Sequence, residues 1–425
     1  MIFAGEFMQD EFPLINLLAV AIPSLLIPSR LLLVFCIPAL MILSFNDVIS
    51  PLFSIGDADI QIFDFVFVIT TLRIIGPMIL RKRAVHTHPI LLTIGLFLGV
   101  LLVATLLTYY RFGEEVFIGE LIAFLRFLAQ VSTLFLIAYS IKTTEQLTLT
   151  QNLILYIGYG IAATIYLNIV LLSTDIDVKF GEVQVTEETI RYFGPLGDQI
   201  GFILLFFIYK TFIDKNLPGT LFFTGALFAT GTRGAVIALT VGIIVMIFQM
   251  RYEMSRTRKK IAMGFAILAI FISFMVLQDV GGIQSRLADA HLEFGFMQRL
   301  TTIKLSLQVF LDNFLIGVGY TGFRYRALDY GAAEIFDEKL SFSPNYVATA
   351  GNQILQTATD GGILALLCLV LISMVALRTL KSAARNTTGE MRKLFVAAHV
   401  WFLSLLMGNL TAAWLLPGSL IAYLL

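Results

Sequence analysis

The sequence predicts an all-α fold, a polytopic transmembrane helical bundle, from three observations. Of its 425 residues, 58% are hydrophobic and 14% are charged, and the mean hydropathy is +0.87. A soluble domain carries roughly 25% charged residues. Apolar runs long enough to cross a bilayer recur along the chain, and basic residues gather in alternate links between them. A chain this apolar cannot cover a water-facing surface, so its solvent is mostly lipid.

The apolar runs follow one another closely, so we expect a single integral membrane domain over residues 1–425. A spanning helix needs about 20 mostly apolar residues. The last run can hold one span with a short re-entrant piece, or two short spans, which gives about 11 to 13 spans in total. The candidate spans are 12–28, 31–46, 60–80, 89–109, 117–139, 150–172, 194–209, 218–232, 234–250, 261–278, 352–377 and 394–424.

Basic residues set the expected orientation, because cytoplasmic links carry an excess of Lys and Arg. When the spans are counted from residue 60 onward, the basic links all fall on one side, which we assign to the cytoplasm. The acidic N-terminus is then outside, or 12–46 is a hairpin divided at the wrong place. The basic links are 81–88, 210–217, 251–260 and 378–393, and the opposite side receives 173–193, the link at Thr232 and Arg233, and 279–351.

The segment 279–351 is the largest stretch outside the apolar runs, and we expect it to form one large external loop region. Within it, residues 293–311 place apolar side chains at helical spacing, which is typical of an amphipathic helix lying on the membrane. These side chains are Phe296, Leu300, Ile303, Leu307 and Phe310.

Composition and motifs exclude several classes of function. The formal net charge is zero, so no overall field attracts nucleic acid. Cys36 and Cys368 lie inside apolar runs without metal-ligand spacing. The sequence has no Walker loop, H-E-x-x-H or G-x-S-x-G motif. Asp57 and Asp59 share D-x-D spacing, but on a short external link. We therefore expect no metal, no cofactor and no nucleic-acid partner.

Two arginines at the membrane edge are the first candidates for chemistry. An intramembrane arginine costs about 2.5–3.5 kcal/mol on insertion scales, so it is a functional candidate by default. Arg233 lies between two apolar runs among small residues that leave room for a ligand. Arg191 begins a polar, turn-forming stretch ahead of a span. Arginine can hold phosphate oxygens by two parallel hydrogen bonds, although either residue could instead contact lipid headgroups.

Further candidates lie on the same expected side. Arg299 falls on the predicted amphipathic helix and Arg286 just before it. Arg324 follows the Gly317–Gly322 stretch, a formal G-x-G-x-x-G match that lacks the soluble strand and helix of a nucleotide site and is expected to be a bend. Each arginine could bind phosphate or face solvent and headgroups.

Acids and bases on that side could remove a proton from an attacking hydroxyl, as a general base must. His291 and Asp198 are both external by the span count, and the sequence alone does not choose between them.

Three elements then appear in order. Thr232-Arg233-Gly234-Ala235 comes first, followed by Arg299 with Asn313-Phe314-Leu315-Ile316-Gly317-Val318-Gly319, and by Asn352-Gln353-Ile354-Leu355-Gln356 with Asp360. This order resembles the O-antigen ligase and polymerase superfamily of bacterial envelope glycosyltransferases, which show an S/T-x-R-G element, an element ending in N-P-L-L-G-V-G, and an H-N-x-x-L-Q element followed by an acid. The resemblance covers roughly residues 60–400.

The resemblance implies a fold of the GT-C type in the bacterial inner membrane, with its active site facing the periplasm. The donor would be an undecaprenyl-diphosphate-linked oligosaccharide, and the acceptor a second glycan. Arg191, Arg233 and Arg299 would hold the diphosphate, with Arg286, Arg324 and Asn352 as further substrate contacts. Transfer would invert the anomeric carbon without a metal, and a chain-length regulator protein would be a further partner.

One departure bears on the reaction. The family's third element has His before Asn, and here that position is Gly351. The missing His favours a polymerase of O-antigen or exopolysaccharide chains over a ligase, and leaves His291 or Asp198 as the base. The alternatives are an O-antigen ligase that uses lipid A core, a protein O-oligosaccharyltransferase and, from a different class, a polysaccharide or lipid transporter.

Overall fold

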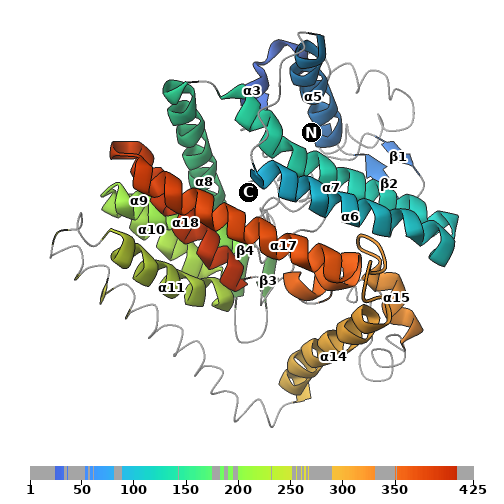
Figure 1. Cartoon of the computed structure of the whole chain (residues 1–425). Coiled ribbons are helices and arrows are strands. Elements are labelled where there is room, and N and C mark those ends of the chain that lie inside the picture. The colour runs from blue at the N-terminus through green and yellow to red at the C-terminus, as the bar shows by residue number, and fades with distance from the viewer. Residues whose placement is uncertain are drawn as a thin grey trace. The chain divides into compact units, whose positions relative to one another are not determined.

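A computed structural model gives the fold of the chain, and most of what it describes is helical (Figure 1). The described residues are 24–32, 36, 53–55, 58–60, 62–80, 89–141, 143–174, 182–185, 190–194, 200–230, 232–250, 255, 260, 263–264, 267, 290–330, 350 and 352–408.

Helices occupy nearly every described segment, which confirms the predicted all-α class. Predicted spans and observed helices agree closely in the middle of the chain. The helices are α3 (Ser29–Leu31), α5 (Ile62–Leu80), α6 (Pro89–Phe112), α7 (Glu114–Ser140), α8 (Thr144–Ser173), α9 (Ile200–Ile213), α10 (Leu217–Ala229), α11 (Arg233–Gln249), α14 (Ala290–Asp312), α15 (Phe323–Asp329), α17 (Gln353–Asn386) and α18 (Gly389–Gly408).

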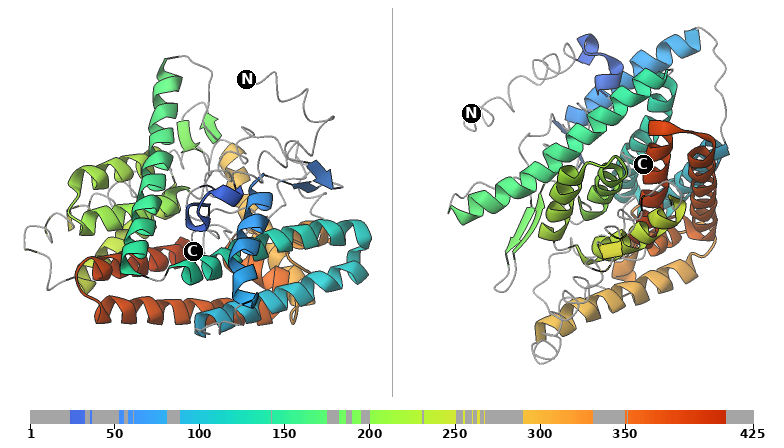
Figure 2. Two further views of the ribbon diagram at one scale, coloured as in Figure 1. Left: turned by 90° about the horizontal axis from the view of Figure 1, so that it is seen from above. Right: turned by 90° about the vertical axis from the view of Figure 1, so that its left-hand side faces the viewer.

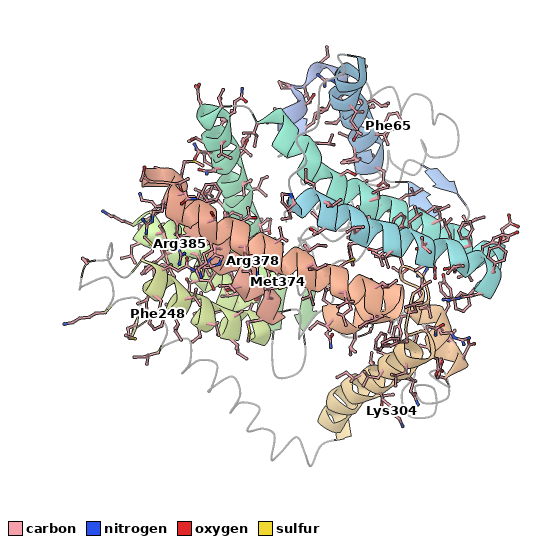
Figure 3. All side chains as sticks on the ribbon, viewed as in Figure 1. Phe65, Phe248, Lys304, Met374, Arg378 and Arg385 are labelled. Carbon is pink, nitrogen blue, oxygen red and sulfur yellow. The ribbon has the colours of Figure 1, made fainter. Side chains whose placement is uncertain are left out.

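Some boundaries differ from prediction. Helix α17 continues past the predicted end at 377, because Arg378, Lys381, Arg385 and the alanines beside them favour helix. The three basic side chains are exposed, and Figure 3 labels Arg378 and Arg385. Helix α9 begins at Ile200 rather than 194. Most of the predicted spans 12–28, 31–46 and 261–278, and the end of 394–424, lie outside the described residues.

Two short hairpins occupy links between helices. Strand β1 (Phe53–Ile55) pairs antiparallel with β2 (Ala58–Ile60). Strand β3 (Glu182–Val185) pairs antiparallel with β4 (Ile190–Gly194), and Gln184 lies opposite Arg191. The second hairpin places residue 194 in a strand, where the span predicted over 194–209 would begin.

Four helices in the described part of the chain are long and apolar enough to cross a membrane. They are α6, residues Glu145–Leu171 of α8, α17 and α18, and α9, α10 and Gly234–Gln249 are shorter apolar helices. Large apolar side chains point outward from them, as Leu92 and Leu96 do on α6 with 67% and 54% of their surface exposed. An apolar exterior of this kind matches a lipid solvent, so the chain is a multi-pass membrane protein.

The chain divides into two compact units. The first comprises residues 1–87, 125–200 and 415–425, and the second comprises 88–124 and 201–414. In the first unit, Arg126 pairs with Asp64 at 3.1 Å and the guanidinium of Arg73 donates to the carbonyl of Ser24 at 2.6 Å. The elements that carry most of the predicted motifs lie in the second unit.

In the second unit, α17 and α18 form a helical hairpin whose members lie side by side in every view (Figure 2). Helix α6 packs along α17, and α11 packs along α18. Helices α14 and α15 both contact α17, and the α15 contact lies near its amino-terminal part (Figure 1). Segments distant in sequence therefore meet at one end of α17.

A buried core that contains a polar contact joins α9, α10, α11 and α18. The Phe207 and Phe223 rings stack 5.2 Å apart, and both side chains are buried. The fully buried Tyr209 hydroxyl lies 2.9 Å from the Ser404 hydroxyl, which donates to the Ala238 carbonyl at 3.2 Å. A Cβ atom at Gly242 would collide with the Tyr209 hydroxyl, so a glycine is needed for this approach. The core fixes these helices against one another.

Candidate functional site

Arg233 is the first residue of α11 and follows the N-cap Thr232. The Thr230 hydroxyl donates to the Thr232 hydroxyl at 2.9 Å and accepts from its backbone N–H at 3.3 Å. A Cβ atom on Gly201 would lie 2.8 Å from the Thr232 Cβ atom, so α9 approaches this corner closely. The small-residue motif thus forms a tight helix-to-helix corner that starts α11 at Arg233, whose side chain lies outside the described part.

The other predicted catalytic residues are described only in part. Arg191 belongs to β4, and both His291 and Arg299 belong to α14, but their side chains lie outside the described residues. Asp198 and Arg286 lie outside them entirely. A helix at Ala290–Asp312 agrees with the helical pattern predicted for 293–311, and its position on the membrane stays a prediction.

Two predicted substrate contacts are fully described. Asn352 is the N-cap of α17, where its side-chain oxygen accepts from the Leu355 N–H at 2.9 Å. Arg324 is exposed on α15 and donates to the Tyr325 hydroxyl at 2.6 Å, with its guanidinium 4.6 Å from that ring's centroid. The Asn352 side-chain oxygen is thus already used as a helix cap, whereas the Arg324 guanidinium is exposed.

The stretch Gly317–Gly322 is a tight turn held against α17. The Val318 N–H donates to the Thr359 carbonyl at 2.8 Å, and the Gly319 N–H donates to the Asp360 carbonyl at 3.0 Å. Gly317 and Gly319 have φ angles of +73° and +109°, which glycine adopts without strain. The turn leads directly into α15, so it places that helix against α17.

A break in α17 creates the partners for this turn. Gly362 has φ +67° and ψ −163° inside the helix, so the helical hydrogen bonds stop there. The Ile363 N–H then donates to the Phe314 carbonyl at 2.8 Å. Backbone polar groups freed within a membrane helix must find protein partners, and the turn supplies them. A Cβ atom on Gly362 would lie 2.5 Å from the Leu315 carbonyl carbon.

Two buried acids flank the turn. Asp360 is 2% exposed and accepts from the Gln356 side-chain amide at 2.8 Å and from the backbone N–H of Thr321. Gln356 in turn accepts from the Ala350 N–H at 2.7 Å. Glu120, on α7, is 0% exposed and accepts from the Thr108 hydroxyl at 2.7 Å. The turn therefore lies between an acid of α7 and an acid of α17.

Helix α6 also contacts the Gly317–Gly322 turn, through Thr105 and Arg111. The Thr105 hydroxyl accepts from the Tyr320 N–H at 3.2 Å, and an Arg111 guanidinium nitrogen donates to the Gly317 carbonyl. Tyr320 is buried against Phe124, with ring centroids 6.2 Å apart. Burial, and then the negative charge of Asp360, raise the pKa of Tyr320 well above its usual value. The Tyr320 hydroxyl therefore keeps its proton.

The sequence analysis did not single out Thr108, Arg111 or Glu120. A signal for Glu120 was present, because it is a carboxyl inside the predicted span 117–139, where ionisable residues are functional candidates by default. All three lie at the ends of spans on the predicted external side, where the turn and Asn352 are also expected. Among the residues that the structure describes, no three His, Cys, Asp or Glu side chains gather as a metal site.

Comparison with known proteins gives one family match. Residues 218–370 match the family model described as O-antigen ligase. The match runs from α10 into the middle of α17, so it includes Arg233, Arg299, the glycine turn and Asp360. Arg191 and Glu120 lie outside it. No curated protein matches the chain.

Proposed function

We propose that the chain is a member of the O-antigen ligase and polymerase superfamily and a membrane glycosyltransferase that polymerises lipid-linked repeat units, since residues 218–370 match the O-antigen ligase family model. The observation that best supports this proposal is that the segments corresponding to the second and third family elements are hydrogen-bonded to each other through their backbones. Residues 314–319 hydrogen-bond to backbone groups of residues 359–363, and both segments lie inside the matched range. The product would be an O-antigen or an exopolysaccharide.

The donor in this proposal is an undecaprenyl-diphosphate-linked oligosaccharide that reaches the site from the outer leaflet of the bacterial inner membrane. Arg191, Arg233 and Arg299 bind its diphosphate by charge-assisted hydrogen bonds. Arg286, Arg324 and Asn352 are further proposed substrate contacts. Arg324 is the one of these whose described side chain is exposed and cationic, which supports a role at the edge of the site.

The reaction is a displacement at the anomeric carbon. An acceptor hydroxyl forms the new carbon–oxygen bond from the opposite face, and the bond to the diphosphate oxygen breaks and leaves its electron pair on the lipid diphosphate. The arginines stabilise that developing charge. The hydroxyl proton passes to a base, for which His291 and Asp198 are the candidates. No metal enters this scheme, because guanidinium groups supply the positive charge.

The acceptor is what separates a polymerase from a ligase. Gly351 replaces the histidine of the third family element, which favours a second lipid-linked repeat unit as acceptor and a polymerase. The description of the matched family, O-antigen ligase, favours the second candidate, in which the acceptor is lipid A core. A protein acceptor is a further variant of the same chemistry, and a chain-length regulator would be a partner of the polymerase.

Genetic complementation tests the proposal. The gene is deleted in its host, and wild type, Arg233→Ala and Arg233→Lys are expressed at matched membrane levels. We expect wild type to restore a ladder of repeat lengths, and both variants to leave a single repeat on the lipid core, because Lys cannot replace a two-pronged phosphate contact.

Two other outcomes decide against a polymerase. If deletion leaves long chains on undecaprenyl diphosphate and none on the core, the protein is a ligase. If deletion changes neither the ladder nor the lipid-linked pool, glycosyl transfer fails, and a transporter of lipid or polysaccharide becomes the better explanation.

A further inference from the structure

Glu120 is a buried acid without an assigned role, seven residues into α7 and outside the family match. Its side chain is fully buried, and its Oε1 atom has no hydrogen-bond partner in the described structure. Its Oε2 atom accepts from Thr108 at 2.7 Å. Burying a carboxyl with one oxygen unmatched costs free energy, so this position calls for an explanation.

The carboxyl of Glu120 lies flat against the backbone of the glycine turn. A Cβ atom on Gly319 would come within 2.6 Å of Oε2, and one on Gly322 within 2.9 Å of Oε1. The same Cβ atoms would lie 2.3 Å from Thr108 Oγ1 at Gly319 and 2.7 Å from the Val318 carbonyl oxygen at Gly322, so the two glycines leave room for both Glu120 and its partner Thr108 beside the turn. The Glu120 carboxyl therefore packs directly against the backbone of the turn.

Asp360 holds the turn from the other side. It accepts the Thr321 N–H, while its own backbone carbonyl accepts the Gly319 N–H at 3.0 Å. The turn is thereby fixed between α7 and α17, and α15 begins at the next residue, Phe323. Arg324 is the second residue of α15 and lies close enough to interact electrostatically with Glu120.

We propose that Glu120 is a positioning residue, which holds the Gly317–Gly322 turn in place and thereby sets where Arg324 is presented to the lipid-linked glycan. The consequence for catalysis rests on the proposed function, but the effect on α15 does not. Because Glu120 is buried and contacts backbone and a hydroxyl, its action depends on shape and hydrogen bonding. Gln, which keeps both, should replace it.

The test compares Glu120→Gln and Glu120→Ala with Glu114→Ala, an exposed acid of the same helix as matched control. A spin label on Leu328→Cys, with Cys36→Ser and Cys368→Ser, reports the mobility of α15, because Leu328 is 51% exposed on that helix. Chain polymerisation and the KM for lipid-linked donor are measured on the unlabelled variants.

We expect wild type, Glu120→Gln and Glu114→Ala to give the same immobile spectrum and the same ladder. Glu120→Ala should give a largely mobile spectrum and lower polymerisation by about 10- to 100-fold, since a misplacement near 1 Å is enough for such a loss. The KM for donor should rise more than kcat falls. Gly322→Ala, whose Cβ atom would meet both the Val318 carbonyl oxygen at 2.7 Å and Glu120 Oε1 at 2.9 Å, should displace the turn and give both effects even if Glu120→Ala fails to reach the membrane.

The opposing results are distinct. An immobile spectrum in Glu120→Ala overturns the proposal, and so does an immobile spectrum in Gly322→Ala where Glu120→Ala fails to reach the membrane. A normal spectrum with lost polymerisation in Glu120→Gln overturns it in favour of a role for the proton or charge of Glu120. A mobile spectrum in Glu120→Ala, in a host where wild type itself makes no glycan ladder, supports positioning of α15 and refutes the polymerase function.

Discussion

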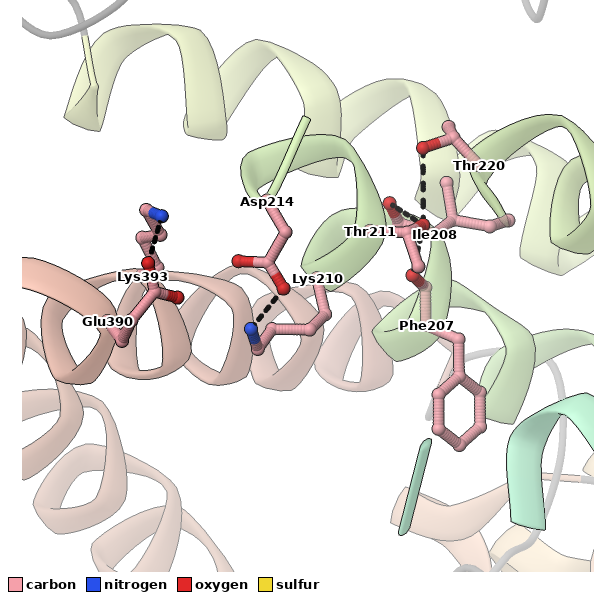
Figure 4. Close-up of polar contacts among 8 residues, drawn as sticks. All are labelled: Phe207, Ile208, Lys210, Thr211, Asp214, Thr220, Glu390 and Lys393. Atoms are coloured by element: carbon pink, nitrogen blue, oxygen red, sulfur yellow. Dashed lines mark hydrogen bonds and ion pairs between the residues drawn. The ribbon is translucent and has the colours of Figure 1, made fainter. Parts of the chain in front are cut away.

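The two ends of the second unit treat their acidic residues in opposite ways. At the end with the glycine turn, Glu120 and Asp360 are buried, and they bond to a hydroxyl, an amide and backbone groups. At the basic end, Asp214 pairs with Lys210 and Glu390 with Lys393, in short-range pairs along the helices (Figure 4). The Glu390 side chain is 72% exposed and the Asp214 side chain 25% exposed, so the contrast with the buried acids is strongest at Glu390.

The difference indicates which end of the unit depends on a fixed arrangement of its polar side chains. Exposed ion pairs contribute about 0–1 kcal/mol and tolerate change. Losing the partner of a buried polar group costs about 1–3 kcal/mol, so each such hydrogen bond helps to hold a geometry. Arg378 and Arg385 lie exposed toward the basic end of α17, where sign of charge matters more than position (Figure 3). The turn end is therefore the one built to hold residues in place.

Replacing a glycine at the turn end should lower the stability of the protein more than replacing an acid at either end. Gly362→Ala introduces a side chain at φ +67° and 2.5 Å from the Leu315 carbonyl carbon. The left-handed conformation costs about 1–3 kcal/mol and overpacking about 1–3 more, so the midpoint of thermal unfolding in detergent should fall sharply. Gly99→Ala, in α6 with open space around it, is the control and should be neutral or stabilising by up to about 1 kcal/mol. Equal effects of the two changes would refute the interlock of turn and α17.

A smaller loss should follow from the acids themselves. Asp360→Ala leaves the Gln356 amide and the Thr321 N–H without their acceptor, at about 1–3 kcal/mol. Asp360→Asn keeps an acceptor oxygen and should lose less. Glu390→Ala at the basic end should cost at most about 1 kcal/mol. Urea unfolding of the three variants ranks them, and a loss for Glu390→Ala equal to that for Asp360→Ala would erase the contrast between the ends.

Alkaline pH should lower the stability of the protein through Tyr320, and this is the smallest of the expected effects. The pKa of Tyr320 is raised in the folded protein, by burial first and then by the charge of Asp360. The stabilisation it contributes is therefore complete below the unfolded pKa of about 10, and is lost as pH rises above that value. We expect the unfolding midpoint to fall between about pH 9 and pH 11, and Tyr320→Phe to reduce that slope. If the unfolding midpoint of Tyr320→Phe falls with pH as steeply as that of wild type, groups other than Tyr320 cause the pH dependence.

Much of the fold was available from the sequence. Long apolar runs with basic links predicted α5 to α8 and α10, because length and hydropathy alone decide whether a segment can lie in lipid. The β3–β4 hairpin was not predicted, since its strands are short and its pairing depends on a partner several residues away. The break in α17 was also missed, because Gly361-Gly362 resembles an ordinary small-residue stretch until a neighbour is seen against it.

Of the candidate site, the sequence by itself determined the order of the motifs, and from local composition it predicts the side of the membrane on which they fall. It also pointed to Arg233, which the structure places at the first position of α11. Only the tertiary structure decided that Glu120, Thr108 and Arg111 surround the glycine turn, some 200 residues away in the chain. Contacts of that range depend on how α6, α7 and α17 pack, and packing complementarity leaves no periodic signal in one sequence.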